Sequence, residues 1–187
     1  ESGLRALLRQ DPDIIMVGET RDAETASISV RAAITGHLVF STLHTNDSVS
    51  SVIRLVDMGL ESYMIANSLV GVVAQRLMRK VCPYCAQAEE PTEEEREFLE
   101  RDIHRVMRPK GCRYCNNTGY KGRTAIHEIL TIDREIREMI SRRATMEEVK
   151  DYATDRQGMR TLKECGVDLV EAGVTTMEEL MKVAYYA

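Results

Sequence analysis

The stretch Asp11–Asp22 has the sequence DPDIIMVGETRD, with four consecutive apolar residues, Ile14 to Val17, at its centre. A short apolar run of this kind predicts a strand that is buried on both faces, as in parallel sheets. Ligands bind such sheets at the carboxyl ends of the strands. Glu19 follows the run after Gly18, so its carboxylate is placed to leave the core and to hold Mg²⁺ or polarise an attacking water.

Predicted helices and strands alternate along the chain after this first strand. Residues 23–34 predict a helix that Gly36 stops, and residues 38–42 predict a second buried strand. Asp47 is a suitable N-cap for a further helix that ends near Met58. Strands and helices that alternate at this spacing indicate an α/β fold with a parallel-type sheet and helical crossovers.

The second strand also ends in polar side chains. These are Ser41, Thr42, His44, Thr45 and Asn46. If the two strands are neighbours, Glu19 and His44 lie at one edge of a cleft, and such a cluster suits phosphate and metal. The simpler alternatives are that Glu19 is a solvated loop residue and that His37, at the start of the strand, is structural.

Four of the five cysteines form two C-x-x-C pairs, Cys82 with Cys85 and Cys112 with Cys115. Two such pairs predict a tetrahedral Zn²⁺ site, and four protein ligands close it, so we expect a structural role. The gap between the pairs is longer than usual, and an acidic helix over residues 92–100 fills it. The alternative is a set of free or redox thiols, while Cys165 has the setting of a plain buried thiol.

Basic residues gather around the second cysteine pair. They are Arg101, Arg105, Arg108, Lys110, Arg113, Lys121 and Arg123. The simplest interpretation is a solvated face. The more specific interpretation is a docking surface for a membrane-embedded platform protein or for anionic lipid. The net charge of −5 and the lack of an aromatic row argue against a nucleic-acid partner.

The composition divides the chain into three predicted segments. Residues 1–81 form the α/β core, residues 82–123 a tetracysteine zinc-binding subdomain, and residues 124–187 a C-terminal helical region. From about Thr124 the pattern is mostly helical, and its apolar stripes predict a small bundle. The helices expected in the C-terminal region are residues 133–141, 145–155, 159–172 and 176–185. Residues 2–9 are expected to end a helix at the start of the core segment.

Two stretches carry a specific resemblance. Residues 9–22, RQDPDIIMVGETRD, resemble the Walker B segment of the secretion ATPases, the hexameric RecA-like motors of type II secretion and type IV pilus assembly. Residues 35–46, TGHLVFSTLHTN, resemble the histidine box of the same family. Residues 74–82, AQRLMRKVC, and the four cysteines resemble the branch that includes the general secretion pathway E and pilus assembly B proteins.

The resemblance implies the C-terminal portion of a RecA-like P-loop ATPase core. It implies that Glu19 and His44 are catalytic, with Glu19 on the Mg²⁺ and water side and His44 sensing the γ-phosphate of ATP. The residues implied to bind the nucleotide cofactor are Glu19, Arg21, His37, His44 and Arg76. Alternatives remain for three of them: subunit contacts for Arg21, a structural role for His37, and a solvated or sheet-edge position for Arg76.

No G-x-x-x-x-G-K-[ST] loop occurs in the 187 residues. In the resembling family this loop lies upstream, together with an acidic box that carries a further glutamate implied to be catalytic. The chain begins with Glu inside a helical pattern, so we expect it to be a fragment of a longer protein. Because the phosphate-binding loop does not occur in it, we expect this fragment alone to be inactive.

The resemblance also implies a homo-hexamer that is cytoplasmic and peripheral to the inner membrane through platform and anchoring proteins. No apolar run approaches the length of a membrane span, and no leader marks the chain for secretion. The alternative is a non-catalytic, zinc-stabilised protein-interaction module. That alternative explains the cysteines but leaves Glu19 and the histidine box unexplained.

Overall fold

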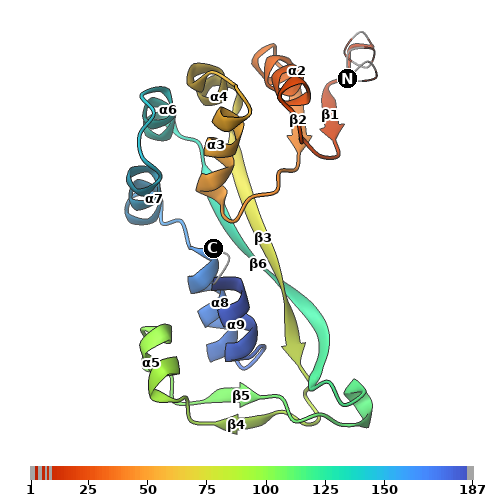
Figure 1. Ribbon diagram of the computed structural model, residues 1–187, viewed down its shortest axis with the longest axis vertical. Coiled ribbons are helices and arrows are strands. Elements are labelled where there is room, and N and C mark those ends of the chain that lie inside the picture. Colours follow the sequence, from red (N-terminus) through yellow and green to blue (C-terminus); the bar gives the residue numbers. More distant parts are fainter. Residues whose placement is uncertain (1–2, 4–5, 7, 9, 185–187) are drawn as a thin grey trace. The chain divides into compact units, whose positions relative to one another are not determined.

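The computed structural model describes residues 3, 6, 8 and 10–184 (Figure 1). The helix expected over residues 2–9 falls largely outside them. The fold is α/β and divides into two compact units, one of Glu1–Val73 with Ile129–Met159 and the other of Ala74–Glu128 with Arg160–Ala187. The three predicted segments are consecutive along the chain, whereas each unit combines two separate stretches. None of the described helices is long and apolar enough to cross a membrane.

The first unit contains a parallel pair of strands, β1 (Ile14–Val17) and β2 (Leu38–Ser41), as predicted. Ile14 pairs with Leu38, and Met16 with Phe40. Burial on both faces was a wrong expectation, because Met16 is 80% exposed and Phe40 54% exposed, whereas Ile15 is buried. Side chains alternate between the faces of a strand, and the described part of the chain covers only the face that carries Ile15.

Five helices of the described residues belong to the first unit, and α3 begins after its predicted cap, Asp47. They are α2 (Ala23–Ile34), α3 (Ser48–Asp57), α4 (Ser62–Ser68), α6 (Arg134–Ser141) and α7 (Met146–Asp155). Asp22, Asp47 and Asp133 accept hydrogen bonds from backbone N–H groups in the first turns of α2, α3 and α6. Thr145 and Glu148 form a capping box at the start of α7. These caps satisfy N–H groups that a helix start leaves without intrahelical partners.

The core of the first unit joins α2, α3, α4, α6 and α7. Ile65 and Ile136 are fully buried in one apolar cluster that also contains Leu130 and Val52. The helices from both stretches of the unit therefore share one core, which lies beside the strands that carry the candidate site.

Replacing Ile136 by Ala is expected to destabilise the first unit by about 3 kcal/mol, because a fully buried side chain leaves a cavity that the surroundings fill only in part. Chemical denaturation of the 187-residue chain measures this change. Ile34→Ala is the matched control, since Ile34 also lies in a helix of this unit but is 45% exposed. Equal losses for the two variants would contradict the assigned core.

The second unit is built on two strands, β3 (Gly71–Val81) and β6 (Tyr120–Thr131), which pair with each other and whose ends extend into the first unit. The helical pattern expected from Thr124 was wrong for residues 124–131, which belong to β6. Ile126, Glu128 and Leu130 are buried while the residues between them are exposed. This period of two identifies a strand, and the buried glutamate hides it in the sequence.

Shorter elements complete the second unit beside the β3–β6 pair. The strands β4 (Gln87–Glu89) and β5 (Val106–Arg108) pair antiparallel, and the other elements are α5 (Glu93–Leu99), the 3₁₀ turn η1 (Arg113–Cys115), α8 (Leu162–Glu171) and α9 (Met177–Ala184). Helices α8 and α9 pack with Met78 and Ile126 in the core of this unit. The single C-terminal bundle expected from the apolar stripes is therefore divided, since α6 and α7 belong to the other core.

Candidate functional site

Three charged or titratable side chains meet where β1 and β2 end. Glu19 lies after β1, and its Oε1 is 3.0 Å from Nε2 of His44, which follows β2. The guanidinium of Arg21 forms an ion pair with the other carboxylate oxygen, Oε2. Because the two strands are parallel neighbours, their carboxyl ends lie at one sheet edge. The sequence prediction that Glu19 and His44 would share this edge matches the observed geometry.

Hydrogen bonds with Thr42, the residue after β2, fix the backbone on both sides of Glu19. Thr42 Oγ1 donates to the Gly18 carbonyl at 2.7 Å, and the Thr20 N–H donates to the Thr42 carbonyl at 3.0 Å. The hydroxyls of Thr20 and Ser41 lie 2.7 Å apart. Thr20 is buried, and no pattern in the sequence singles it out. Only the pairing of the strands shows that Thr20 holds the loop that carries Glu19.

The charge state of Glu19 follows from its neighbours. The hydrogen bond from Arg21 lowers the pKa of the Glu19 carboxyl below its ordinary value, and the charges of Arg21 and His44 act in the same direction. The carboxylate is therefore ionised at neutral pH. A general base works best with a pKa near the working pH, so this group is better suited to attract a cation than to accept a proton.

The other candidates of the histidine box have local partners. His37 Nδ1 lies 3.1 Å from the Ala32 carbonyl and 3.4 Å from the Thr35 hydroxyl, at the end of α2. Thr45 bonds the Ser51 hydroxyl at 2.8 Å, at the start of α3. Asp47 caps the same helix. These bonds give His37 and Thr45 structural partners, as the simpler alternative for His37 expects.

Arg76 belongs to a different part of the fold. It is half-buried on β3, in the second unit, and its guanidinium donates to the Gln75 carbonyl at 3.1 Å. Glu19 and His44 belong to the first unit. The contacts within the first unit thus bring together Glu19, Arg21 and His44, and Arg76 is not among them.

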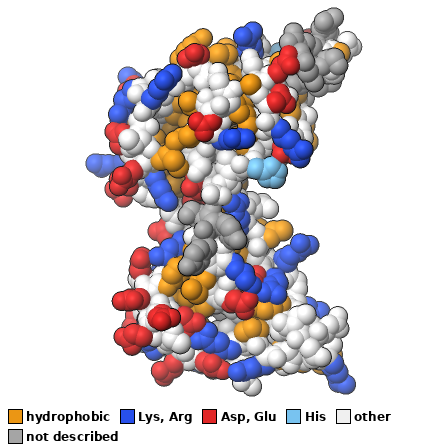
Figure 2. Space-filling view, viewed as in Figure 1, with side chains coloured by type: hydrophobic (Ala, Val, Ile, Leu, Met, Phe, Trp, Pro, Cys, Tyr) orange, Lys and Arg blue, Asp and Glu red, His pale blue; other side chains and the backbone are white. Residues whose placement is uncertain are grey.

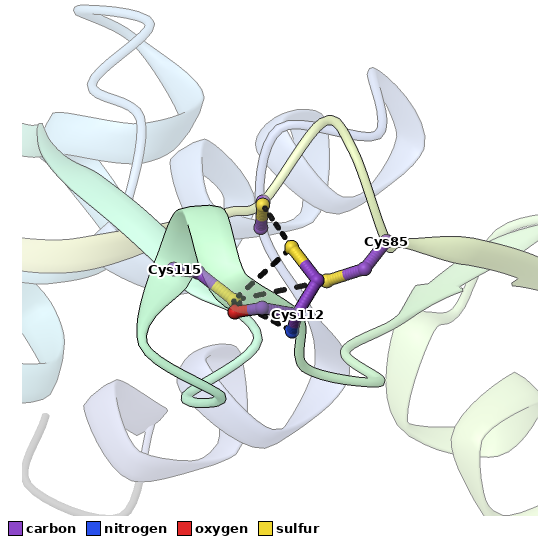
Figure 3. Close-up of side chains that lie close together, drawn as sticks. Cys85, Cys112 and Cys115 are labelled. Atoms are coloured by element: carbon purple, nitrogen blue, oxygen red, sulfur yellow. Dashed lines mark hydrogen bonds between the residues drawn. The ribbon is translucent and has the colours of Figure 1, made fainter.

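The four predicted metal ligands converge in the second unit. Their sulfur atoms all lie within 4.8 Å of one another (Figure 3). Cys82 and Cys112 are 3.9 Å apart at sulfur, while Cys115 lies 3.8 Å from both Cys85 and Cys112. A tetrahedron with Zn–S bonds of about 2.3 Å has S···S edges of about 3.8 Å. The donor set therefore fits a four-coordinate metal ion such as zinc, and the spacing is too long for a disulfide.

Backbone groups orient these sulfurs. The N–H groups of Cys112 and Gly119 each lie 3.2 Å from Cys115 Sγ. Burial raises the pKa of the Cys115 thiol, but donation from these N–H groups lowers it to about 6. The Cys82 N–H donates to the Gly119 carbonyl at 2.9 Å and so joins the two cysteine turns. Thiolates are the form that binds metal, so the local backbone prepares the ligand.

Gly119 is required where the second cysteine turn meets Pro109. Its φ is +79°, and a Cβ at this position would lie 2.4 Å from the Pro109 Cβ. A side chain would therefore meet both an unfavourable backbone conformation and a steric clash. Glycine is therefore the residue that this turn requires at position 119.

This α/β arrangement is similar to that of a solved motor protein. The structure titled "Crystal Structure of the Pilus Retraction Motor PilT and Bound ADP" superimposes with a TM-score of 0.69 at 28% identity, over 97% of this chain and 42% of that one. The model of the family "Type II/IV secretion system protein" matches residues 1–182. The chain therefore belongs to the type II/IV secretion system protein family.

Curated relatives are more similar in sequence. "Type II secretion system ATPase E" of Vibrio cholerae is 46% identical over 184 residues, which are 97% of this chain and 36% of that protein. "Type IV pilus assembly ATPase PilB" of Thermus thermophilus is 49% identical over 183 residues, which are 95% of this chain and 20% of that protein. The chain thus spans about a third or less of the length of these relatives.

Proposed function

We propose that this chain is the C-terminal part of a RecA-like P-loop ATPase whose full-length parent hydrolyses ATP to power type II protein secretion or type IV pilus assembly. The observation that carries the proposal is the cluster of Glu19, Arg21 and His44 at the carboxyl ends of two parallel strands. Membership in the secretion family supports it, because named relatives are ATPases of these two machines.

Glu19 and His44 have different proposed roles. A bound Mg²⁺ would neutralise charge on the phosphates of ATP, and the ionised Glu19 carboxylate is the group of this edge that attracts it, directly or through water. His44 has an exposed ring whose Nε2 contacts Glu19, so the rest of the ring, including Nδ1, is open to a γ-phosphate. Arg21 fixes the Glu19 carboxylate and supplies a positive charge beside it.

For two residues the local geometry favours the alternatives. The bonds of His37 to the end of α2 support a structural role. The position of Arg76 on β3 supports the sheet-edge alternative. We therefore limit the proposed nucleotide-facing set in this chain to Glu19, Arg21 and His44.

We further propose that Cys82, Cys85, Cys112 and Cys115 hold one structural Zn²⁺. The tetrahedral spacing of their sulfurs and the N–H groups directed at Cys115 support this assignment. Four thiolates leave no coordination position open, so the ion would join the two cysteine turns and take no part in hydrolysis.

The assembly proposed for the parent is a homo-hexamer in the cytoplasm that contacts the inner membrane through platform and anchoring proteins. ATP would then be hydrolysed between subunits. This chain contains one edge of that site, and other parts of the assembly would supply the rest. The alternative, a non-catalytic zinc-stabilised interaction module, accounts for the cysteine cluster but gives no reason for an ionised glutamate beside His44.

Steady-state ATP hydrolysis tests the proposal. The full-length parent with Mg²⁺ is expected to turn over ATP, whereas the 187 residues alone are expected to give no turnover above background. The reason is that the phosphate-binding loop, which supplies backbone N–H groups and a lysine to the phosphates, does not occur in this sequence. A parent without turnover under assembled conditions would favour the interaction module. Turnover by the 187 residues would contradict the assignment of this chain as part of a site.

A further inference from the structure

Five of the seven basic residues near the second cysteine pair, together with Lys80 of β3, fall into two groups. One group is neutralised. Arg101 contacts Asp168 at 2.7 Å and Glu171 at 3.2 Å, Arg108 contacts Glu95 at 2.6 Å, and Lys110 contacts Glu89 at 2.9 Å. These three cations serve the packing of the second unit. They are therefore not available to attract a partner.

The other group gathers at the cysteine turns without a carboxylate partner among the described residues. Arg113 lies within η1, with its guanidinium carbon 5.1 Å from the centre of the Tyr114 ring. Lys121 Nζ donates to the Tyr114 carbonyl at 3.3 Å. The Lys80 side chain passes 3.9 Å from the position a Cβ on Gly122 would take. Their positive charges are thus concentrated at one end of this unit.

Two tyrosines lie among these cations. Tyr84 and Tyr114 occupy the same position in the two C-x-x-C pairs, directly before the second cysteine. Their rings stack with centres 4.7 Å apart and planes inclined by 29°. Tyr84 and Tyr114 remain 68% and 51% exposed, so about half or more of each residue stays accessible to solvent. We call Lys80, Tyr84, Arg113, Tyr114 and Lys121 the knuckle patch.

The charge distribution sets this patch apart from the rest of the unit. On the face seen in Figure 2, acidic side chains gather over the side that carries α5, while the side of the cysteine turns shows basic and uncharged ones. The first turn of α5 alone contains Glu93, Glu94 and Glu95. In a chain with a net charge of −5, a local group of free cations gives a directional field that steers anionic partners.

We propose that the knuckle patch is a docking surface for an acidic segment of another protein. Tyrosine and arginine are the residues that most often carry the binding energy of protein interfaces, and the patch contains both at its centre. The two cysteine turns hold the rings in place before binding, so little ordering entropy is lost on association. Carboxylates of the partner would meet Lys80, Arg113 and Lys121, and its apolar side chains would cover the stacked rings.

Two other occupants fit the patch less well. Lipid-binding clusters contain about four to eight Lys and Arg residues, whereas three free cations line this patch. Single-stranded nucleic acid stacks its bases on open aromatic faces, whereas Tyr84 and Tyr114 cover each other's inner faces. A short acidic peptide needs neither a wide basic field nor a free pair of ring faces.

Direct binding to the zinc-loaded 187-residue chain tests the proposal without ATP, so its outcome is separate from that of the ATPase proposal. The probe is a fluorescent poly(Glu,Tyr) copolymer, and poly(Lys,Tyr) is the probe of opposite charge. Arg113→Glu with Lys121→Glu is expected to weaken binding of the acidic copolymer by about tenfold or more. Tyr84→Ser with Tyr114→Ser is expected to weaken it by about fivefold.

A matched pair controls for net charge. Arg137→Glu with Lys150→Glu makes the same charge change on exposed positions of α6 and α7, and we expect less than about a twofold loss. Unchanged zinc content and circular dichroism show that each variant is folded. Equal losses in both pairs, or no binding of the acidic copolymer, would overturn the proposal. Tighter, patch-dependent binding of phosphatidylserine vesicles or of an oligothymidylate would overturn it in favour of a membrane or nucleic acid.

Discussion

Glu19→Gln in the full-length parent is expected to lower kcat for ATP hydrolysis by about 10²-fold or more, with much less change in nucleotide affinity. Glutamine keeps the size of the side chain and removes its charge. The carboxylate lies at the edge where β1 and β2 end, paired with Arg21 and His44, and its pKa is below the ordinary value. An ionised carboxylate placed there would attract the Mg²⁺ that neutralises charge on the phosphates, and a neutral amide would attract this ion much less.

The matched control is Glu147→Gln, the same substitution at an exposed position of α7 in the same unit. Its kcat is expected to equal that of the unmodified parent. Turnover and nucleotide binding are measured on the assembled protein with Mg²⁺, and the oligomeric state is checked for both variants. Full turnover of Glu19→Gln would make Glu19 a solvated loop residue, which is the simpler alternative that the sequence leaves open.

Most helix boundaries of this fold are predictable because their causes are local. Asp22, Asp47 and Asp133 each precede a helix that their side chains cap. Thr145 and Glu148 form a capping box at the spacing that the sequence contains. An N-cap needs only its own residue and the next three, so such signals survive without knowledge of the tertiary structure.

The prediction of a helical pattern over residues 124–131, which form β6, failed because its cause is not local. Glu128 is 2% exposed and accepts a hydrogen bond from the Leu162 N–H at 3.3 Å, at the start of α8. In the sequence this glutamate interrupts an alternation of apolar residues and makes residues 124–131 resemble a helix. Its burial depends on a residue 34 positions away, which no local pattern contains.

In the candidate sites, too, the features with local causes were predicted and those that depend on distant residues were not. The C-x-x-C spacing encodes each cysteine turn locally, and the two turns do meet. Glu19 and His44 were predicted together because parallel strands align their carboxyl ends. Thr20 was missed, since its role depends on hydrogen bonds to Ser41 and Thr42 across the strand pair. Likewise, which cations are neutralised near the cysteines depends on carboxylates of α5 and α8.

Removal of zinc is expected to unfold the region of the cysteine turns and to lower the thermal midpoint of the second unit by about 10 °C or more. The ion would connect β3, which ends at Val81, to the turn that leads into β6. Without it, Cys82 and Cys115 remain buried close to two further thiols, and thiolates so near one another repel. Cys112→Ser, which removes one ligand, is expected to have the same effect as a chelator.

Cys165→Ser is the matched control for this prediction. Cys165 lies on α8, and its sulfur donates to the His127 carbonyl at 3.3 Å, a bond that a serine hydroxyl can replace. This variant is expected to keep about one zinc per chain and an unchanged midpoint, measured by elemental analysis and calorimetry. If Cys112→Ser keeps both as well, the four cysteines are free or redox thiols. The knuckle patch would then lack the rigid base on which its stacked tyrosines depend.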